Sequence, residues 1–159
     1  MERYQRIIQH ELYKNAYESI YRAEENREFC HHDMEHFLAV ARLTYIFVLE
    51  QNLPMSKDIV YALGFLHDIG RCKEYENGTP HEEAGIEIAR EILPACGYNQ
   101  EECSMILQII GDHRNKECFL HPCSAVFYQA DKISRNCQEC KAYHQCYWSE
   151  EKKNHKYTY

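Results

Sequence analysis

The residues with the clearest chemical potential in this chain are His67 and Asp68, which directly follow the apolar run YALGFL. An imidazole and a carboxylate next to a core segment are costly to bury unless a partner compensates them. Similar polar side chains extend apolar helical stripes elsewhere in the sequence, and these are His36, His81, His113 and Asp131. A shared cation would satisfy all of these groups at once.

Histidine and aspartate together suit a divalent metal such as Fe, Mn, Co, Ni or Zn. Such an ion lowers the pKa of a bound water from about 16 to about 7 and polarises a phosphoryl oxygen. The expected chemistry is therefore metal-assisted hydrolysis, with His67 and Asp68 as the central catalytic residues. With two ions, Asp68 would be well placed to bridge them.

The segments that must position these side chains have the periodicity of helices. Helical spacing of apolar residues runs over approximate ranges, which are 2–25, 33–51, 56–68, 81–94, 99–113 and 122–145. This pattern predicts an all-α fold, a compact single-domain bundle of about six helices. In the second range, for example, His36 shares one helical face with Val40 and Leu43.

Capping signals set the expected helix starts. Ser56 is a predicted N-cap, and Asn99 with Glu102 predicts a capping box. Thr79 is a further predicted N-cap, with Pro80 and Glu82 completing its first turn. Residues 70–80, which precede that start, are expected to form a polar loop with a turn at Asn77-Gly78.

The local contexts of these residues resemble those of the HD-domain superfamily of metal-dependent phosphohydrolases. The segment EHFLAVARL resembles the family's first-ligand helix, LGFLHDIGR its signature segment and AVFYQADKIS its closing Ala-Asp. The resemblance covers roughly residues 30–135. It implies that His36, His67, Asp68 and Asp131 hold a first metal ion.

Two more segments resemble the additional ligands of dinuclear members of that family. They are HEEAG at His81 and IIGDHR at His113, and the members include hydrolases of dinucleotide polyphosphates. His121 is a candidate third ligand for the second ion. One or two ions therefore remain open. No continuation of the HD-GYP type follows His113, which disfavours a cyclic dinucleotide phosphodiesterase of that kind.

Basic residues near the motifs are candidates for binding phosphate. Arg71 stands where the family often has lysine, and a guanidinium meets phosphate with a planar fork. Lys132, Arg114 and Arg135 are further candidates. Ordinary surface charge explains each of them individually just as well.

A cysteine cluster near the C-terminal end is not required by the HD motif. Cys137, Cys140 and Cys146 form a C-x2-C-x5-C run, which suits zinc or an iron–sulfur cluster. A fourth ligand is needed, and the candidates are His144, Cys30, Cys118 and Cys123. Some iron–sulfur nucleases carry a similar run. The alternative is a set of reduced cysteines on a helix, with residues 137 and 140 on one face.

Length and composition bound the class of protein. With 159 residues, the chain can form one domain with a core. We expect a helical domain over 1–150, which includes the cysteine-rich segment 137–146, and a frayed polar tail over 151–159. No apolar run approaches the about 20 residues that span a membrane, and no signal-peptide core is present, so a cytoplasmic protein is expected.

Charge and motifs together leave several functions open. The net charge of −7 argues against nucleic acid as a partner, and a homodimer is compatible with the sequence. The leading hypothesis is a phosphohydrolase whose substrate is a small phosphorylated molecule, a nucleotide being favoured. The alternatives are a di-iron oxygenase of the HD fold and a non-catalytic module that senses a nucleotide or a metal.

Overall fold

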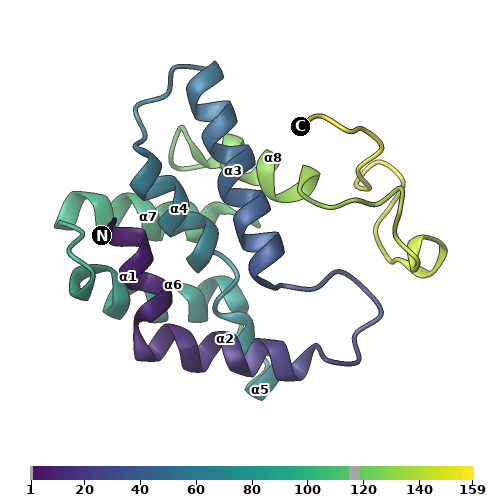
Figure 1. The fold of residues 1–159 in the computed structure, drawn as a ribbon, viewed down its shortest axis with the longest axis horizontal. Helices are drawn as coiled ribbons and strands as arrows, with labels where there is room; N and C mark the ends of the chain where they lie inside the picture. Colours follow the sequence, from purple (N-terminus) through teal and green to yellow (C-terminus); the bar gives the residue numbers. More distant parts are fainter. Residues whose placement is uncertain (1, 115–118) are drawn as a thin grey trace.

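Every regular element of the described chain is a helix (Figure 1). The computed structural model describes residues 2–114 and 119–159. Over these ranges the elements are α1 (Arg3–Gln9), α2 (Glu11–Ala23), α3 (Met34–Glu50), α4 (Lys57–Leu66), α5 (Arg71–Asn77), α6 (His81–Ala95), α7 (Gln100–Asp112), α8 (Ser124–Ile133) and the 3-10 turn η1 (Tyr143–Gln145). The expectation of an all-α fold is confirmed. The described residues form more helices than the expected six.

The first expected helix is divided in two at His10. This residue has an extended backbone, with φ −68° and ψ 133°. Its Nδ1 accepts a hydrogen bond from the amide of Leu12 at 3.2 Å, so its side chain caps α2. The prediction of a single helix over 2–25 was therefore wrong. A side chain that accepts from the free amides at a helix end favours the start of a new helix.

The expected polar loop over 70–80 is also wrong, since α5 occupies most of it. This helix ends at Gly78, whose φ of 80° is the left-handed conformation that glycine adopts without strain. Thr79 does not cap α6. Its amide and hydroxyl both donate to Asn77 Oδ1, at 3.0 and 2.7 Å, and Pro80 becomes the residue before the helix. A local side-chain turn has displaced the predicted capping box.

The other predicted caps are confirmed, but the last helix is shorter than expected. Ser56 accepts from the amide of Ile59, and Asn99 forms the capping box with Glu102. The helix expected to continue to about 145 ends at Ile133, with Ser134 as its cap. The alternative that placed the cysteines of 137–146 on a helix is therefore wrong, because only the short η1 is regular there.

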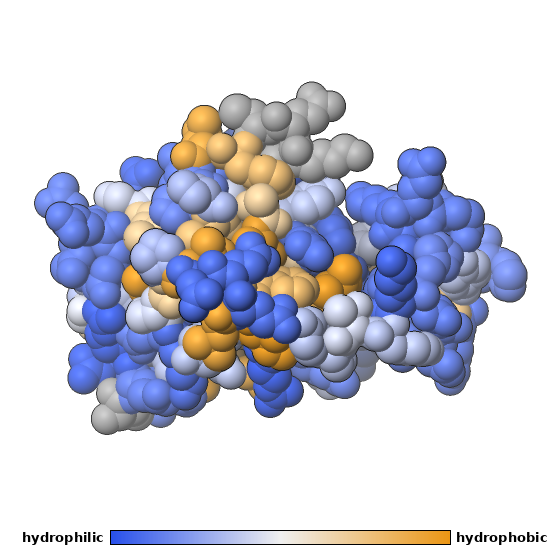
Figure 2. Space-filling view, turned by 90° about the horizontal axis from the view of Figure 1, so that it is seen from above, coloured by the Kyte–Doolittle hydropathy of each residue, from blue (hydrophilic) through white to orange (hydrophobic). Residues whose placement is uncertain are grey.

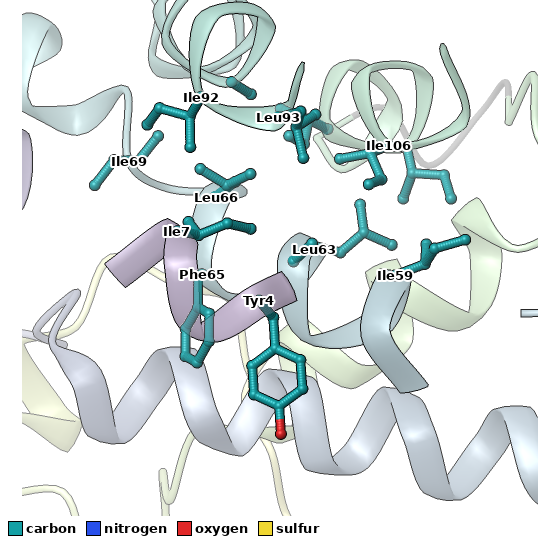
Figure 3. Close-up of a cluster of buried hydrophobic side chains, with 14 of the residues drawn as sticks. Tyr4, Ile7, Ile59, Leu63, Phe65, Leu66, Ile69, Ile92, Leu93 and Ile106 are labelled. Atoms are coloured by element: carbon teal, nitrogen blue, oxygen red, sulfur yellow. The ribbon is translucent and has the colours of Figure 1, made fainter. Parts of the chain in front are cut away.

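The core lies around α4, which packs against α1, α3 and α7. Its residues Leu63 and Leu66 are fully buried, and burial of such a side chain contributes about 1.5–3 kcal/mol. Figure 3 shows this cluster, with labelled side chains from α1, α4, α6, α7 and the segment after α4. His67 and Asp68 directly follow α4, a helix in which seven of the ten residues are buried.

The C-terminal segment lies on the side of the molecule where the α2–α3 loop also lies (Figure 1). The tail makes defined contacts. Asn154 Nδ2 donates to the carbonyls of Ile133 and Arg135, at 2.9 and 3.0 Å. The Tyr159 ring lies 5.9 Å from that of Phe47 on α3. These contacts hold the polar tail against the helical domain.

The face drawn in Figure 2 is mostly polar. Figure 2 shows one face on which hydrophobic residues gather near the middle, with hydrophilic residues on both sides. None of the helices within the described ranges is both long and apolar enough to cross a membrane.

Candidate metal centre

Six candidate ligands from five helical elements converge inside the bundle. His36 lies in the first turn of α3, His67 and Asp68 follow α4, His81 begins α6, His113 caps α7 and Asp131 lies near the end of α8. All six are buried. Among the described residues they form two groups that share Asp68, and the ligand atoms within each group lie within 4.8 Å of one another.

The first group joins two imidazoles and two carboxylates. His36 Nε2 lies 3.5 Å from both Asp68 Oδ2 and Asp131 Oδ1. His67 Nε2 lies 3.1 Å from Asp68 Oδ2 and 3.7 Å from Asp131 Oδ1. One ion among these atoms would be within reach of all four side chains.

The second group uses the other oxygen of the same aspartate. His81 Nε2 lies 3.2 Å from Asp68 Oδ1, and His113 Nε2 lies 3.8 Å from it. The two imidazole nitrogens are 3.2 Å apart. Asp68 therefore presents Oδ2 to one group and Oδ1 to the other, which is the arrangement of a bridging carboxylate.

The unpaired atoms of the first group fit a metal. His36 Nε2 and His67 Nε2 are buried and have no hydrogen-bond partner. Leaving a buried polar atom unsatisfied costs about 1–3 kcal/mol, so such atoms are rare in folded proteins. Nitrogen and carboxylate oxygen donors are the set that divalent transition metals accept. The residues present therefore fit a divalent cation.

Backbone carbonyls fix two of the imidazoles. His67 Nδ1 donates to the carbonyl of Gly64 at 2.9 Å, and His113 Nδ1 donates to that of Ile110 at 2.5 Å. Because Nδ1 donates to a carbonyl, Nε2 is the atom of each ring that can bind a metal, and it faces Asp68. Partners of this kind orient histidine ligands and raise their basicity.

Side chains fix the other two imidazoles. His81 Nδ1 lies 3.1 Å from Glu74 Oε2, and because a carboxylate oxygen accepts, the imidazole donates this hydrogen bond. His36 Nδ1 lies 3.2 Å from Ser134 Oγ. The Ser134 hydroxyl donates to the carbonyl of Asp131 at 2.7 Å, so its oxygen accepts from His36. All four histidines thus point Nε2, the ring atom that can bind a metal, toward Asp68 or Asp131.

The candidate ligands have shifted pKa values, and Asp68 stays ionised between the two groups. Burial alone would raise the pKa of Asp68, but the charges of His67 and Arg71 outweigh it and hold this pKa well below its usual range. Burial lowers the pKa of His36 to about 4. Burial would also lower the pKa of His67, but Asp68 and Asp131 outweigh it and raise it to about 9. A cation entering here would displace the proton from His67.

Glycine allows α4, α5 and α6 to approach closely enough to form the second group. A Cβ on Gly70 would lie 2.0 Å from the carbonyl oxygen of His81 and 2.3 Å from the amide of Gly85. No side chain fits there. The glycine that follows His67-Asp68 therefore lets His81 come within reach of Asp68.

The candidate phosphate-binding residues have different surroundings. Arg71 is mostly buried and donates to Asp68 Oδ1 at 3.1 Å and to Glu74 Oε2 at 2.9 Å. Lys132 Nζ lies 2.5 Å from Asp131 Oδ2. Arg114 is half exposed and lies 3.5 Å from Glu82. Arg71 and Lys132 thus contact the metal-ligand candidates directly, whereas Arg114 does not.

His121 lies outside both groups. Its Nδ1 accepts from the amide of Cys123 at 3.1 Å, within the segment before α8. The buried Asp112 holds this segment, because its Oδ2 accepts from the amide of His121 and from the hydroxyl of Ser124. The structure therefore does not bring His121 to the second group. The cysteines 137, 140 and 146 also lie elsewhere, around a cavity that His36 borders.

His32 also lies next to the centre, although the sequence favours His36 over the His31-His32 pair because only His36 is followed by Val40-Ala41 at the family's spacing. The His32 side chain is buried, and its Nε2 lies 3.9 Å from Asp68 Oδ2. Its Nδ1 pairs with the buried Glu24, which also accepts from the amide of His32 at 2.7 Å and from the hydroxyl of Tyr75 at 2.5 Å. The available signal for His32 was the position of that pair just before the first-ligand helix.

Comparisons with known proteins agree with this geometry. The model of the HD domain family matches residues 33–136. An uncharacterized protein of Clostridium beijerinckii is 46% identical over 136 residues, which are 86% of this chain and 85% of that protein. Ribonuclease Y 1 of Pediococcus pentosaceus is 26% identical over 103 residues, 64% of this chain but 18% of that protein. No solved structure matches the chain.

The matched region includes every member of the two ligand groups, from His36 to Asp131. It covers more than half of the chain. The histidines and aspartates that match the family's motif order are the residues whose side chains converge in the structure. The chain therefore belongs to the HD domain family of metal-dependent phosphohydrolases.

Proposed function

We propose that this protein hydrolyses a phosphate ester or anhydride, with a nucleotide as the substrate. The observation that carries the proposal is the pair of ligand groups that share Asp68, with buried Nε2 atoms on His36 and His67 that have no hydrogen-bond partner. Divalent ions held there would supply an activated water and a charge that polarises the phosphoryl group.

The residues of the chain have distinct tasks in this proposal. His36, His67, Asp68 and Asp131 hold the first ion, and Asp68 with His81 and His113 holds the second. The Nδ1 hydrogen bonds keep each imidazole in the tautomer that can bind metal. Because these side chains are buried, their charges act in a medium of low dielectric, where electrostatic stabilisation is strongest.

Two basic side chains are suited to meet the phosphate. Arg71 and Lys132 lie against Asp68 and Asp131, so they are next to the proposed reacting atoms. Their charges would balance the phosphate in a chain whose net charge is −7. Arg114 is more distant, and we assign it no direct role.

A nucleotide is favoured over a polymeric nucleic acid. The relative named as a ribonuclease acts, by that name, on RNA, but this chain spans only 18% of its length. An acidic chain repels the phosphate backbone of a long nucleic acid. A single nucleotide or dinucleotide carries far fewer charges and needs only the local basic groups.

Release of phosphate from a nucleotide panel tests this proposal. The protein would be purified without oxygen and loaded in turn with Mn²⁺, Fe²⁺, Co²⁺, Ni²⁺ or Zn²⁺. We expect turnover by the wild type and by His144→Asn, an exposed control outside both ligand groups. His67→Asn should show none. Absence of turnover by a fully loaded wild type would contradict the proposal, and oxygen uptake in its place would favour an oxygenase.

A further inference from the structure

Cysteines from two distant parts of the chain line one cavity. Cys137, Cys140 and Cys146 of the C-terminal segment border a cavity of about 390 Å³, and Cys30 of the α2–α3 loop borders it as well. All four are free thiols. Cys137 is buried, and the other three are partly buried.

The structure distinguishes among the candidates for a fourth ligand. Cys123 is buried in the main hydrophobic core, away from this cavity. His144 is not among the residues that border it. Cys118 lies outside the described residues. Among the described cysteines outside the run, Cys30 is therefore the one that borders the same cavity as the C-x2-C-x5-C run.

Local backbone structure brings the run together. The amide of Cys140 donates to the carbonyl of Cys137 at 3.2 Å, which closes a turn between these two cysteines. The amide of Tyr143 donates to the carbonyl of Cys140 at 3.0 Å, and the chain then passes through η1 to Cys146. A turn between two cysteines followed by a short return is a suitable scaffold for thiolate ligands.

The C-terminal segment is ordered without a hydrophobic core of its own. Among the described residues, none beyond Ile133 belongs to either hydrophobic core cluster. Large apolar side chains there face solvent, as with Tyr147 at 76% exposure and Tyr157 at 68%. Short segments that cannot bury enough apolar surface are commonly stabilised by a bound metal.

Basic side chains border the same cavity. Arg135 Nη1 donates to the carbonyl of His31 at 2.6 Å and so links the C-terminal segment to the α2–α3 loop. Lys153 is buried beside the cavity. The charge of Arg135 would offset part of the negative charge of four thiolates around a metal, whereas that of Lys153 is already paired with Glu150 at 2.6 Å.

We propose a metal centre with four thiolate ligands, separate from the two ligand groups at Asp68. Its ligands are Cys30, Cys137, Cys140 and Cys146. No three of these sulfurs lie within 4.8 Å of one another in the described chain. A zinc ion would therefore draw them inward, whereas an iron–sulfur cluster is large enough to reach them farther apart. In either form the centre fastens the C-terminal segment to the α2–α3 loop, and it does not depend on the proposed hydrolysis.

Metal analysis and absorption of the anaerobically purified chain test this site. We expect a thiolate-bound metal, seen as visible sulfur-to-iron absorption, or as near-ultraviolet sulfur-to-cobalt absorption after Co²⁺ replaces zinc. Cys30→Ser and Cys140→Ser should lose this absorption and keep the ions at Asp68. Cys103→Ser, a partly buried cysteine on α7, is the matched control and should keep it.

Thiol titration of the wild type makes the test independent of how the variants fold. Metal loading should protect four more thiols from modification than are protected in the metal-stripped protein. The iron-to-sulfide ratio separates a cluster from zinc. Full absorption in Cys30→Ser, or unprotected thiols in the metal-loaded wild type, would overturn the proposal.

Discussion

Asp68 is the residue on which both ligand groups depend. Its Oδ2 faces His36 and His67, and its Oδ1 faces His81 and His113. No neighbouring carboxylate in the described groups can take its place, because Asp131 contacts only the first group.

Replacing Asp68 should therefore remove more than replacing Asp131. We expect Asp68→Ala to lose both ions and all hydrolysis. Asp131→Ala should keep the ion between His81 and His113 and lose the first. Metal content per chain after dialysis checks this, with far-ultraviolet circular dichroism as the control for folding. Equal metal loss in both variants would contradict a bridging role for Asp68.

His32 allows a sharper test of the surroundings of Asp68. It faces Asp68 at 3.9 Å and is held by Glu24, but it belongs to neither ligand group. We expect His32→Ala to slow phosphate release and to leave the metal content unchanged. His31→Ala is the matched control, since the His31 imidazole forms a hydrogen bond with the carbonyl of Arg27 at 2.9 Å. Loss of an ion from His32→Ala would show that His32 is a ligand.

At the residue scale, the candidate metal ligands can be predicted from the sequence, but the side chains that hydrogen-bond to the neighbouring histidines cannot. The six candidate ligands were predictable, because each extends an apolar stripe and the motif order resembles that of a known family. Glu24, Glu74 and Ser134 were not, because each acts through a histidine from another segment. Such pairs depend on how the helices pack, which a single sequence does not display.

At the scale of elements, the approach of α6 to the end of α4 decides whether two ions can bind. Gly70 is in contact with the first turn of α6, and α5 carries Glu74 to His81. Both features lie in the segment that was expected to be a loop. Its helix was missed because five of its seven residues are polar or charged and the other two, Cys72 and Tyr75, form no apolar stripe, although its charges pair within one turn.

A methyl group at Gly70 should disturb this approach. We expect Gly70→Ala to destabilise the fold by about 1–3 kcal/mol or more, since overpacking forces the backbone to move. The affinity for the second ion should also fall. Gly85→Ala is the matched control, because the nearest atom to its Cβ would be at an ordinary 3.6 Å. Urea unfolding measures the free energy of unfolding of both variants. Equal stability of the two variants would contradict the close contact.

Glu74 should set the affinity of the second ligand group. Its Oε2 accepts from His81, so Glu74→Ala frees the ring to rotate. Loss of such a partner costs about 10–100-fold in metal affinity. Titration with Co²⁺ should show this loss for the second ion only. Glu76→Ala, which breaks only an exposed pair with Lys73, should bind both ions normally.

At the scale of the whole molecule, the ions would join elements that are far apart in sequence. The ligands come from α3, the end of α4, α6, α7 and α8, which are most of the bundle. The all-α class and this convergence were predictable from periodicity. The course of residues 134–159 was not, because few apolar residues there carry a periodic signal.

Metal removal should therefore destabilise the whole fold. An ion present at 100 times its Kd stabilises the folded state by about 2.7 kcal/mol, which corresponds to roughly 5–10 °C in Tm for a chain of this size. We expect a chelator to lower the Tm of the wild type by such an amount. Asp68→Ala should respond much less, and an equal response would assign the effect to another site.

The positions of the bound ions decide whether Asp68 bridges two metals. Crystals grown with Mn²⁺ would be measured by anomalous diffraction. We predict two peaks, one among His36, His67, Asp68 and Asp131 and one among Asp68, His81 and His113, with one Asp68 oxygen on each. A manganese peak elsewhere, or none between these side chains in a crystal soaked at saturating Mn²⁺, would contradict this account.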